Sequence, residues 1–334
     1  MNSMENSFKA VVVDNRENRF TVDVKDWTLD QLSPGEVVIK VHYSGVNYKD
    51  GLASTPDGKI VRVYPHIPGI DLAGKVVSST DERFKEGDSV LATSYEIGVS
   101  HSGGYSEYAR VPADWIVPLP DGLTLKEAMI FGTAGFTAAL SVQRLQENDL
   151  KKEDGPVLVT GATGGVGSFG VAMLSKLGYQ VTASTGKESA KDYLTKIGAT
   201  QVVDRDEVYS GKIKALDKQL WAGAIDPVGG ETLASILSKV KYGGSVAVSG
   251  LTGGGSVPTS VFPFILRGVN LLGIDSVYCP MEQRRKIWSR LATDLKPEDM
   301  TPFIYKEVSL EQLPQELPAI LKGEMIGRIL VRVG

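Results

Sequence analysis

The stretch Val157-Leu-Val-Thr-Gly-Ala-Thr-Gly-Gly-Val-Gly167 decides the fold of this 334-residue chain. Three apolar residues enter a glycine-rich turn, and an apolar helical pattern between Val171 and Leu177 leaves it. Strand, tight turn and helix in this order allow a pyrophosphate to bind free backbone N–H groups at a helix N-terminus. The spacing Ala162-x-Gly164-x-x-Gly167 is close to the dinucleotide fingerprint, with Ala in place of the first glycine. Because the flanking strand and helix are also present, the stretch predicts a dinucleotide site.

The end of the next expected strand indicates which dinucleotide binds. Ser184, Thr185, Gly186 and Lys187 stand there, at a position where NAD-binding folds usually carry an Asp or Glu for the ribose hydroxyls. A carboxylate repels a 2′-phosphate, whereas hydroxyls and an ammonium bind one. We therefore predict NADP(H). The alternative, that Ser-Thr-Gly only caps the following helix, is compatible with either cofactor.

Composition and charge exclude several classes of protein. The chain is 42% hydrophobic and 23% charged, with a net charge of −4, which is typical of a globular protein and gives no nucleic-acid footprint. The N-terminus lacks the charged and apolar regions of a signal peptide. The longest apolar stretch, residues 128–142, is interrupted by glycine and threonine and is too short to span a bilayer. We expect a cytoplasmic protein with no nucleic-acid or membrane partner.

Cysteine usage argues against zinc chemistry. The chain has one cysteine, Cys279, and three histidines. A disulfide within the chain, a Cys₄ zinc site and a Cys-His-Cys catalytic zinc site are therefore impossible. Because no HExxH or similar spacing occurs either, we expect no metal site.

Two patterns of secondary structure divide the chain. Through residue 125, short β patterns alternate with Gly/Pro turns, which predicts a compact barrel-like β domain. Residues 126–276 alternate strands with helices, which predicts right-handed βαβ units and a doubly wound parallel sheet. Residues 277–334 return to β patterning, and we expect them to rejoin the first domain.

A resemblance to a known family covers essentially the full length. The matching segments are Asn47-Tyr-Lys-Asp50, Ile67-Pro-Gly-Ile-Asp-Leu-Ala-Gly74, Gly132-Thr-Ala-Gly-Phe-Thr-Ala138, Thr160–Gly167, Trp221-Ala-Gly-Ala-Ile-Asp226, Pro263-Phe-Ile-Leu-Arg267 and Gly273-Ile-Asp-Ser-Val277. They resemble the zinc-free quinone oxidoreductases of the medium-chain dehydrogenase/reductase superfamily, and in particular its acryloyl-CoA reductase subfamily. Zinc-dependent relatives carry a Cys at Asn47-Tyr48 and a His-Glu pair at Ile70-Asp71, so the resemblance agrees with the cysteine count.

The resemblance implies the fold class and the reaction. The fold would be α/β, a Rossmann doubly wound parallel sheet at 126–276 plus a GroES-like β-barrel-type catalytic domain at 1–125 and 277–334. The reaction would be hydride transfer from NADPH to an activated C=C bond, as in acryloyl-CoA. Tyr48 would be a catalytic hydrogen-bond donor or only pack on the nicotinamide, and Asn47 would contact a carbonyl or the nicotinamide, or form an Asx-turn. We expect Asp50 on the surface, paired with Lys49, rather than orienting Tyr48.

The resemblance also implies a set of cofactor-binding residues. The set includes Arg205, for which the alternative to cofactor binding is a solvated loop arginine beside Asp204 and Asp206. The set is Tyr48, Thr163, Gly164, Gly165, Val166, Thr185, Gly186, Lys187, Arg205, Leu251, Ile265 and Ser276.

Two other functions remain open from the sequence. One is an NADPH:quinone reductase with the same fold and cofactor, and the other is a non-catalytic NADPH-binding protein. Family members commonly form homodimers through the outer strand of the nucleotide-binding sheet, which here would be the segment around 270–274. The expected partners are therefore a small-molecule substrate, an enoyl-CoA or a quinone, and a second copy of the chain.

Overall fold

The computed structural model describes residues 7–16 and 19–334, and this part of the chain forms two compact units. The first unit comprises residues up to Thr133, Val277–Trp288 and Ile304–Gly334. The second comprises Ala134–Ser276 and Ser289–Phe303. The sequence analysis placed Ser289–Phe303 with the first domain. In the structure Phe303 stacks on Phe169 of the second unit, with ring centroids 4.5 Å apart.

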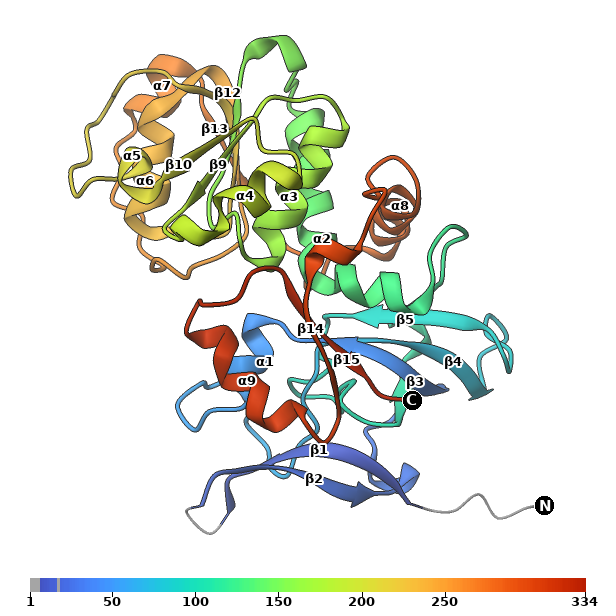
Figure 1. The fold of residues 1–334 in the computed structure, drawn as a ribbon. Coiled ribbons are helices and arrows are strands. Elements are labelled where there is room, and N and C mark those ends of the chain that lie inside the picture. The colour runs from blue at the N-terminus through green and yellow to red at the C-terminus, as the bar shows by residue number, and fades with distance from the viewer. Residues whose placement is uncertain (1–6, 17–18) are drawn as a thin grey trace. The chain divides into compact units, whose positions relative to one another are not determined.

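A seven-stranded sheet dominates the first unit. Its order is β14-β15-β3-β4-β5-β7, and β6 also pairs with β3. The C-terminal strand β15 is hydrogen-bonded to β3, so the end of the chain completes the sheet that its beginning starts (Figure 1). The strands are β3 (Val37–Gly45), β4 (Asp71–Ser79), β5 (Ser89–Thr93), β6 (Tyr108–Val111), β7 (Ile116–Pro118), β14 (Ile304–Ser309) and β15 (Arg328–Arg332).

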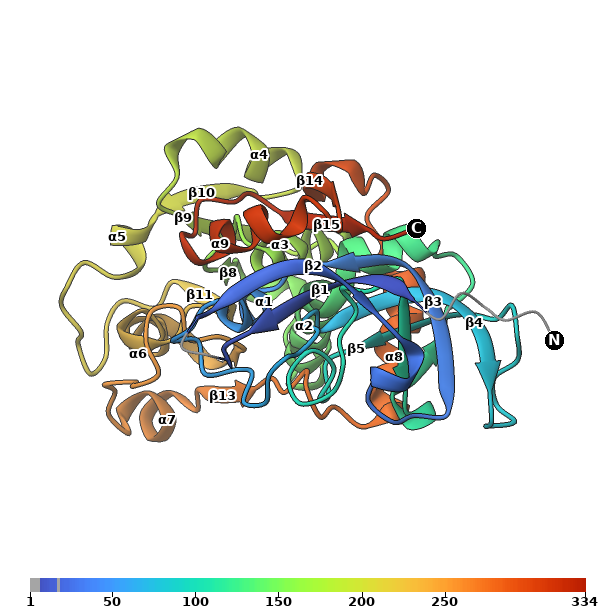
Figure 2. The ribbon, with the colours of Figure 1, turned by 90° about the horizontal axis from the view of Figure 1, so that it is seen from below.

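Alternating apolar residues give this sheet its buried face. Val37, Ile39 and Val41 are at most 1% exposed and recur at every second position of β3, so they point to the same side. They pack in one cluster with Leu72 of β4 and Val90 of β5. A separate two-stranded antiparallel sheet, β1 (Phe8–Asp14) with β2 (Thr21–Trp27), belongs to the same unit (Figure 2).

Two short helices of the first unit pack against each other. Helix α1 (Tyr48–Ala53) directly follows β3, and it packs against α9 (Leu313–Leu321). The long element α2 (Leu125–Glu147) is interrupted at Gly132, whose φ of 50° and ψ of −156° are not helical. The division between the two units falls one residue later. Helix α8 (Met281–Ala292) begins in the first unit and ends in the second, and the first unit also contains the 3₁₀ turns η2 (Leu29–Gln31) and η3 (Ala113–Trp115).

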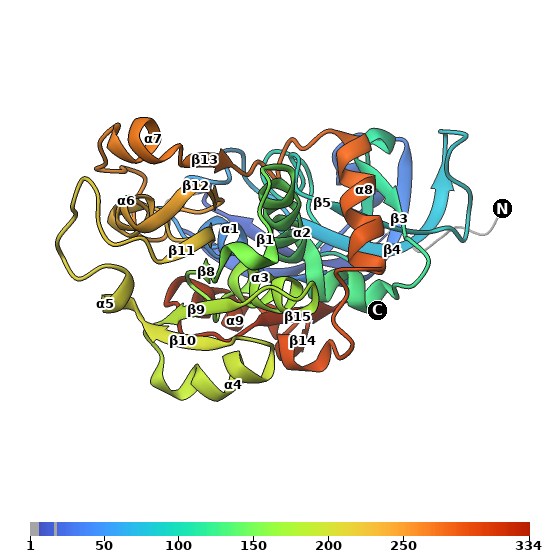
Figure 3. The same cartoon turned by 90° about the horizontal axis from the view of Figure 1, so that it is seen from above.

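The second unit contains the parallel sheet that the sequence predicts. Its six strands follow one another in the order β10-β9-β8-β11-β12-β13, and every neighbouring pair is parallel (Figure 3). The chain moves outward from β8 to β10 and then returns to the other side at β11, so the strand order reverses between β8 and β11. The strands are β8 (Val157–Val159), β9 (Val181–Thr185), β10 (Gln201–Asp204), β11 (Trp221–Asp226), β12 (Val240–Val248) and β13 (Asn270–Gly273).

Helices cover both faces of this sheet. Right-handed crossovers on opposite sides of the reversal place α3 and α4 on one face and α6 and α7 on the other (Figure 1). The prediction of a doubly wound sheet is therefore confirmed. The elements are α3 (Gly165–Lys176), α4 (Lys191–Lys196), α5 (Arg205–Val208), α6 (Gly230–Lys239), α7 (Phe262–Arg267), η4 (Lys152–Asp154), η5 (Glu188–Ala190) and η6 (Thr301–Phe303).

Within residues 7–16 and 19–334, no helix combines the length and the apolar character that crossing a membrane requires.

Candidate functional site

The glycine-rich turn between β8 and α3 brings backbone segments into contact. A Cβ atom on Gly167 would lie 2.3 Å from the Gly161 carbonyl oxygen and 2.7 Å from the Cα of Ala162, so only glycine fits there. Gly161 itself has a φ of 51°, in the left-handed region that favours glycine. The turn therefore folds back closely on the first turn of α3, as a phosphate-binding loop requires.

The N-terminus of α3 is suited to an anion. Gly164 is the N-cap residue and, as a glycine, supplies no side-chain capping bond. The first N–H groups of an α-helix have no partner inside the helix and carry the positive end of its dipole. A diphosphate placed here would complete these bonds, so the turn fits the group that the sequence predicts. Four predicted cofactor residues lie in this turn: Thr163, Gly164, Gly165 and Val166.

Two cations lie near the end of β9, where a 2′-phosphate is predicted. A Cβ atom on Gly186 would lie 2.6 Å from Nε and 2.8 Å from Cζ of Arg205, so the guanidinium lies directly against this glycine. Lys187 is the next residue, and its N–H donates to Oγ1 of Thr185 at 3.1 Å. Strands β9 and β10 are neighbours with Thr185 opposite Asp204, which brings Arg205 to this position from the next strand. The structure therefore brings four predicted residues together.

Three acidic residues in the segments around Gly186 and Arg205 are bonded to other groups. The Asp204 side chain caps the first turn of α5, and Glu207 accepts from the Asp204 N–H at 3.1 Å. Glu188 pairs with Lys191 at 2.7 Å. The Arg205 guanidinium itself lies beside Gly186, and no ion pair joins it to Asp204 or Glu207 within the described residues.

The other predicted residues of this unit are more scattered. Leu251 lies in the loop after β12 and is 67% exposed. Ser276 follows β13, and both positions are at the carboxyl edge of the sheet, where ligands of such folds bind. Ile265 lies on α7, in the crossover before β13 rather than at the end of a strand, and is also 67% exposed.

In the first unit, Asn47 is part of a buried polar cluster. Its Nδ2 donates to Asp71 at 2.8 Å and to Asp50 at 3.2 Å, and its Oδ1 accepts from Arg328 at 2.8 Å. Asn47 is only 7% exposed. Since both amide hydrogens are already used, the geometry favours a positioning role for Asn47 over direct contact with a substrate carbonyl.

The expectation that Asp50 lies on the surface is wrong. Asp50 is fully buried, and its carboxylate accepts from the backbone N–H of Asn47 at 2.8 Å and of Ile70 at 2.9 Å. Burial, together with the nearby Asp71, raises the pKa of Asp50 to about 7. Asp50 therefore fixes the first turn of α1 from below instead of pairing with Lys49.

Asp71, Thr133 and Arg328 also belong to this cluster, and none of the three was predicted as a site residue from the sequence. Asp71 accepts from the Thr133 N–H at 2.9 Å and lies 3.5 Å from the Arg328 guanidinium. Arg328 also donates to the Val46 carbonyl at 2.9 Å. A Cβ on Gly132 would lie 2.4 Å from Asp71 and 2.5 Å from Arg328, so the break in α2 makes room for the ion pair. The one local signal was Arg328 itself, a charged residue that begins an apolar strand.

Tyr48 differs from its neighbours because it is accessible. It is the first residue of α1 and is 41% exposed. No described residue forms a hydrogen bond with its hydroxyl. The buried cluster thus fixes the backbone at the start of α1, and the phenol of Tyr48 remains accessible there.

Comparison with known proteins identifies the family. Residues 33–121 match the alcohol dehydrogenase GroES-like domain, and residues 165–293 match the zinc-binding dehydrogenase model. The putative quinone oxidoreductase YhfP of Bacillus subtilis is 59% identical over 99% of this chain and 100% of its own length. The acrylyl-CoA reductase AcuI of Ruegeria pomeroyi is 51% identical over 98% of this chain and 99% of its own length.

The chain belongs to the quinone oxidoreductase family of medium-chain dehydrogenases/reductases. The predictions of family, fold class and enzyme class, an oxidoreductase, are thereby confirmed.

Solved structures of this family carry nicotinamide cofactors. The crystal structure of Bacillus subtilis yhfP has NAD bound, and it has a TM-score of 0.96 with 60% identity over 98% of this chain and 99% of that one. The structure of Escherichia coli YhdH has NADPH bound, with a TM-score of 0.94 and 47% identity over 97% of this chain and 100% of that one. The zinc-binding model matches by fold, but the described residues contain no group of three or more His, Cys, Asp or Glu that could hold a metal ion.

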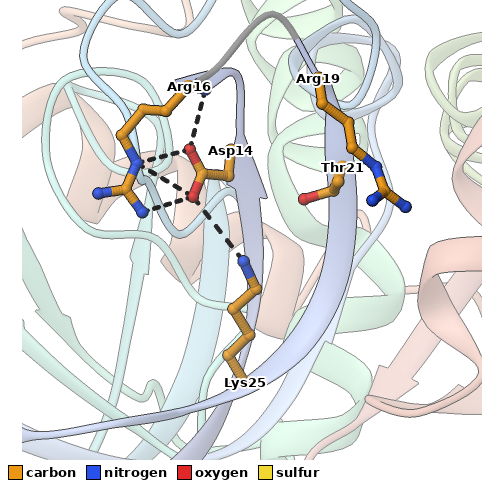
Figure 4. A pocket seen from close by; sticks show the side chains of 5 residues that line it. All are labelled: Asp14, Arg16, Arg19, Thr21 and Lys25. Carbon is orange, nitrogen blue, oxygen red and sulfur yellow. Dashed lines mark hydrogen bonds and ion pairs between the residues drawn. The ribbon is translucent and has the colours of Figure 1, made fainter.

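A surface pocket of about 300 Å³ lies at the end of the β1–β2 sheet, outside the predicted site (Figure 4). It is lined by Asp14, Arg16, Arg19, Thr21 and Lys25. Arg16 donates to both carboxylate oxygens of Asp14, at 2.9 and 2.7 Å, and lowers the pKa of Asp14 to about 2. The Asp14 carboxylate is thus already paired, and no predicted site residue lines the pocket. We therefore assign the pocket no part in the family's reaction.

Proposed function

We propose that this quinone oxidoreductase family member is an NADPH-dependent, zinc-independent reductase of an activated C=C bond in an α,β-unsaturated thioester such as acryloyl-CoA. The choice of acceptor rests on the 51% identity with the acrylyl-CoA reductase of Ruegeria pomeroyi over nearly the whole of both chains. The cations at the end of β9 support NADPH over NADH.

The chemistry sets a demand that the first unit can meet. Bound NADPH supplies a hydride to the β-carbon of the thioester. Negative charge then develops on the thioester oxygen, and a positioned hydrogen-bond donor must stabilise it where no metal does so. A proton must also reach the α-carbon. We assign the donor role to Tyr48, because its exposed hydroxyl is not bonded within the described residues, and the positioning role to Asn47.

The proposed cofactor site follows the strand ends of the second unit. The α3 N-terminus would take the diphosphate, and Lys187 with Arg205 would take the 2′-phosphate. The full set that we propose is Tyr48, Thr163, Gly164, Gly165, Val166, Thr185, Gly186, Lys187, Arg205, Leu251, Ile265 and Ser276. In terms of domains, we propose that the first unit supplies the catalytic groups and the second binds NADP(H).

A second candidate is a true NADPH:quinone reductase. The 59% identity with the putative quinone oxidoreductase of Bacillus subtilis favours it. Steady-state rates with NADPH and either acryloyl-CoA or a simple quinone separate the two, and we expect kcat/KM to be higher for acryloyl-CoA. A preference of tenfold or more for the quinone would overturn the proposal. Binding of NADPH with no turnover on enals, enones, enoyl-CoAs or quinones would instead support a non-catalytic role.

We also propose that the protein is a cytoplasmic homodimer. Strand β13 is an outer strand of its sheet, and Leu271 on it is 41% exposed. Helix α7 beside it exposes Phe262 (45%) and Leu266 (56%). An apolar outer strand of this kind is a template for pairing with a second copy. The single cysteine suits a reducing compartment.

A further inference from the structure

A buried hydrogen bond joins the two strands between which the sheet reverses its order. Asp226 is the last residue of β11, and Thr160 directly follows β8. The Thr160 hydroxyl donates to the Asp226 carboxylate, and the two residues are 2% and 0% exposed. Strands β8 and β11, which Figure 3 shows side by side, are neighbours in the sheet. This bond therefore lies at the carboxyl edge of the sheet, where the strand order reverses. Dinucleotides bind across this position in open parallel sheets.

The same carboxylate holds a left-handed turn. Its Oδ1 accepts from the Val228 N–H at 3.2 Å, and its Oδ2 accepts from the Gly229 N–H at 2.9 Å. Gly229 and Gly230 have φ values of 74° and 58°, a conformation that side chains rarely adopt. The carboxylate therefore accepts three hydrogen bonds and fixes the backbone that leads into α6.

This turn in turn supports the loop after β12. The Gly253 N–H donates to the Val228 carbonyl at 2.8 Å, and the Ser249 N–H donates to the Asp226 carbonyl at 3.0 Å. A Cβ on Gly230 would lie 2.2 Å from the Gly253 carbonyl oxygen. The Asp226 carboxylate thus joins the residue before the glycine-rich turn to residues 227–230. Backbone hydrogen bonds then join residues 226–228 to residues 249–253.

The chemical cost of this arrangement indicates that it has a function. No described cation pairs with Asp226, and burial raises the pKa of its carboxyl group. An unpaired buried carboxylate is expensive, and a packed apolar side chain would cost less at this position. In addition, the Ser249 hydroxyl is buried without a hydrogen-bond partner among the described residues. A polar group that could bond a ligand therefore lies at the start of the loop 249–254.

The position of these segments shows which half of the cofactor they face. The proposed 2′-phosphate site lies at β9 and β10, on one side of the reversal. A dinucleotide that crosses the reversal therefore places its nicotinamide half over β11 and β12. The exposed loop with Leu251 follows β12 on that side.

We propose that Asp226 and Thr160 are positioning residues that hold residues 227–230 and 249–254 in the shape that receives the nicotinamide half of NADP(H). The inference rests on NADP(H) binding and not on the identity of the acceptor. Neither side chain needs to touch the cofactor, since both act through the backbone that they hold.

The test compares ligands that carry one or both halves of the cofactor. Asp226→Asn turns one acceptor into a donor that faces an N–H or O–H group, and Thr160→Val removes one bond. Each variant is titrated with NADPH, with NADH and with adenosine 2′,5′-bisphosphate, which lacks the nicotinamide half. We expect each variant to lose about tenfold in affinity for NADPH, and the same factor for NADH, because both cofactors carry the nicotinamide half. Binding of the bisphosphate should change less than twofold, and Thr160→Ser, which keeps the hydroxyl, should match the wild type.

Three results would overturn the inference. One is unchanged affinity for NADPH in both variants. Another is an equal loss of the bisphosphate and NADPH, which would mean general damage to the unit. The third is a loss in Thr160→Ser as large as that in Thr160→Val. If Asp226→Asn does not fold, as judged by thermal unfolding, the Thr160 pair decides the question alone. No acceptor enters these titrations, so they remain decisive even if acryloyl-CoA is not the substrate.

Discussion

The guanidinium of Arg328 donates to the side-chain oxygen of Asn47 at 2.8 Å, across 281 positions of the chain. Asn47 in turn donates to Asp50 and Asp71, so one arginine and two carboxylates are held in a buried cluster directly before Tyr48. The proposed donor therefore stands on a helix whose start depends on β4 and β15. This dependence leads to the first two predictions.

Removal of the arginine should destabilise the protein strongly. Arg328→Met leaves Asp71 as a buried carboxylate without its cation, and breaking such a pair costs about 3–5 kcal/mol. The free energy of unfolding from denaturant titration measures this loss. Arg332→Met is the matched control, because Arg332 is exposed on the same strand and should change stability by less than about 0.5 kcal/mol. A loss below about 1 kcal/mol for Arg328→Met would show that the cluster contributes little.

Titration of Asp50 should make stability depend on pH. Its pKa is about 7 in the folded protein and about 3.9 when unfolded, so the folded state holds one more proton between these values. The contribution of Asp50 is therefore complete below pH 4 and is lost as pH rises to about 7, at about 1.4 kcal/mol per pH unit. His66 acts in the opposite direction, because burial lowers its pKa to about 4. Its contribution is complete above pH 6.5 and is lost as pH falls.

The measurement must separate these two groups. Asp50→Asn mimics the protonated carboxyl and keeps His66, so the difference in unfolding free energy between wild type and variant isolates Asp50. We expect this difference to shift in favour of the variant as pH rises from 5 to 7 and to be constant above pH 8. A difference that does not change with pH would mean that Asp50 is ionised throughout.

The fold of the second unit could be predicted from the sequence because the patterns that indicate its strands and helices are local. Apolar runs such as Val157–Val159 and Trp221–Asp226, separated by glycine turns and helical patterns, predict parallel strands without knowledge of distant residues. The signal for strand β2 is weaker, because Thr21–Trp27 alternates apolar and polar residues only in part. Its charged residues and short loop gave no clear pattern for a buried face.

The site in the first unit could not be predicted in the same way. Asp50 follows Lys49 in a polar stretch, and such a carboxylate is usually exposed. Its burial results from Asp71 and Arg328, which arrive on strands far apart in the sequence. The spacing of residues around Asp50 contains no information on its contact with these distant strands. By contrast, Lys187 could be predicted as a phosphate-binding residue because it stands at the end of an expected strand, and Arg205 because the family resemblance implies it.

The cations at the end of β9 should determine cofactor preference. Lys187→Ala should weaken NADPH binding by about 1–3 kcal/mol and leave NADH almost unchanged, since only NADPH carries the 2′-phosphate. Fluorescence titration of the reduced nicotinamide measures both affinities. Lys191→Ala is the control, because Lys191 pairs with Glu188 at 2.7 Å. Equal losses for both cofactors in Lys187→Ala would refute the assignment.

A charge on the outer strand should separate the proposed dimer. Leu271→Lys places an ammonium on β13, a substitution that blocks pairing at a sheet edge. We expect the wild type to sediment as a dimer and the variant as a monomer at the same concentration. Tyr242→Lys serves as a control, because Tyr242 is 78% exposed in the same unit but lies near the start of β12, before the residues of β12 that pair with β13. A monomeric wild type, or a variant that remains dimeric, would contradict the proposed interface.

Loss of the Tyr48 hydroxyl should slow the chemical step. Tyr48→Phe keeps the ring, and with it any packing on the nicotinamide, but removes the donor for the developing negative charge. We expect kcat with acryloyl-CoA to fall about 100-fold, while the affinity for NADPH changes little. Tyr305→Phe is the control, because Tyr305 is 54% exposed in the same unit and has no proposed role. An unchanged kcat would leave Tyr48 with a packing role, and a parallel loss of NADPH affinity would place its hydroxyl on the cofactor instead of the acceptor.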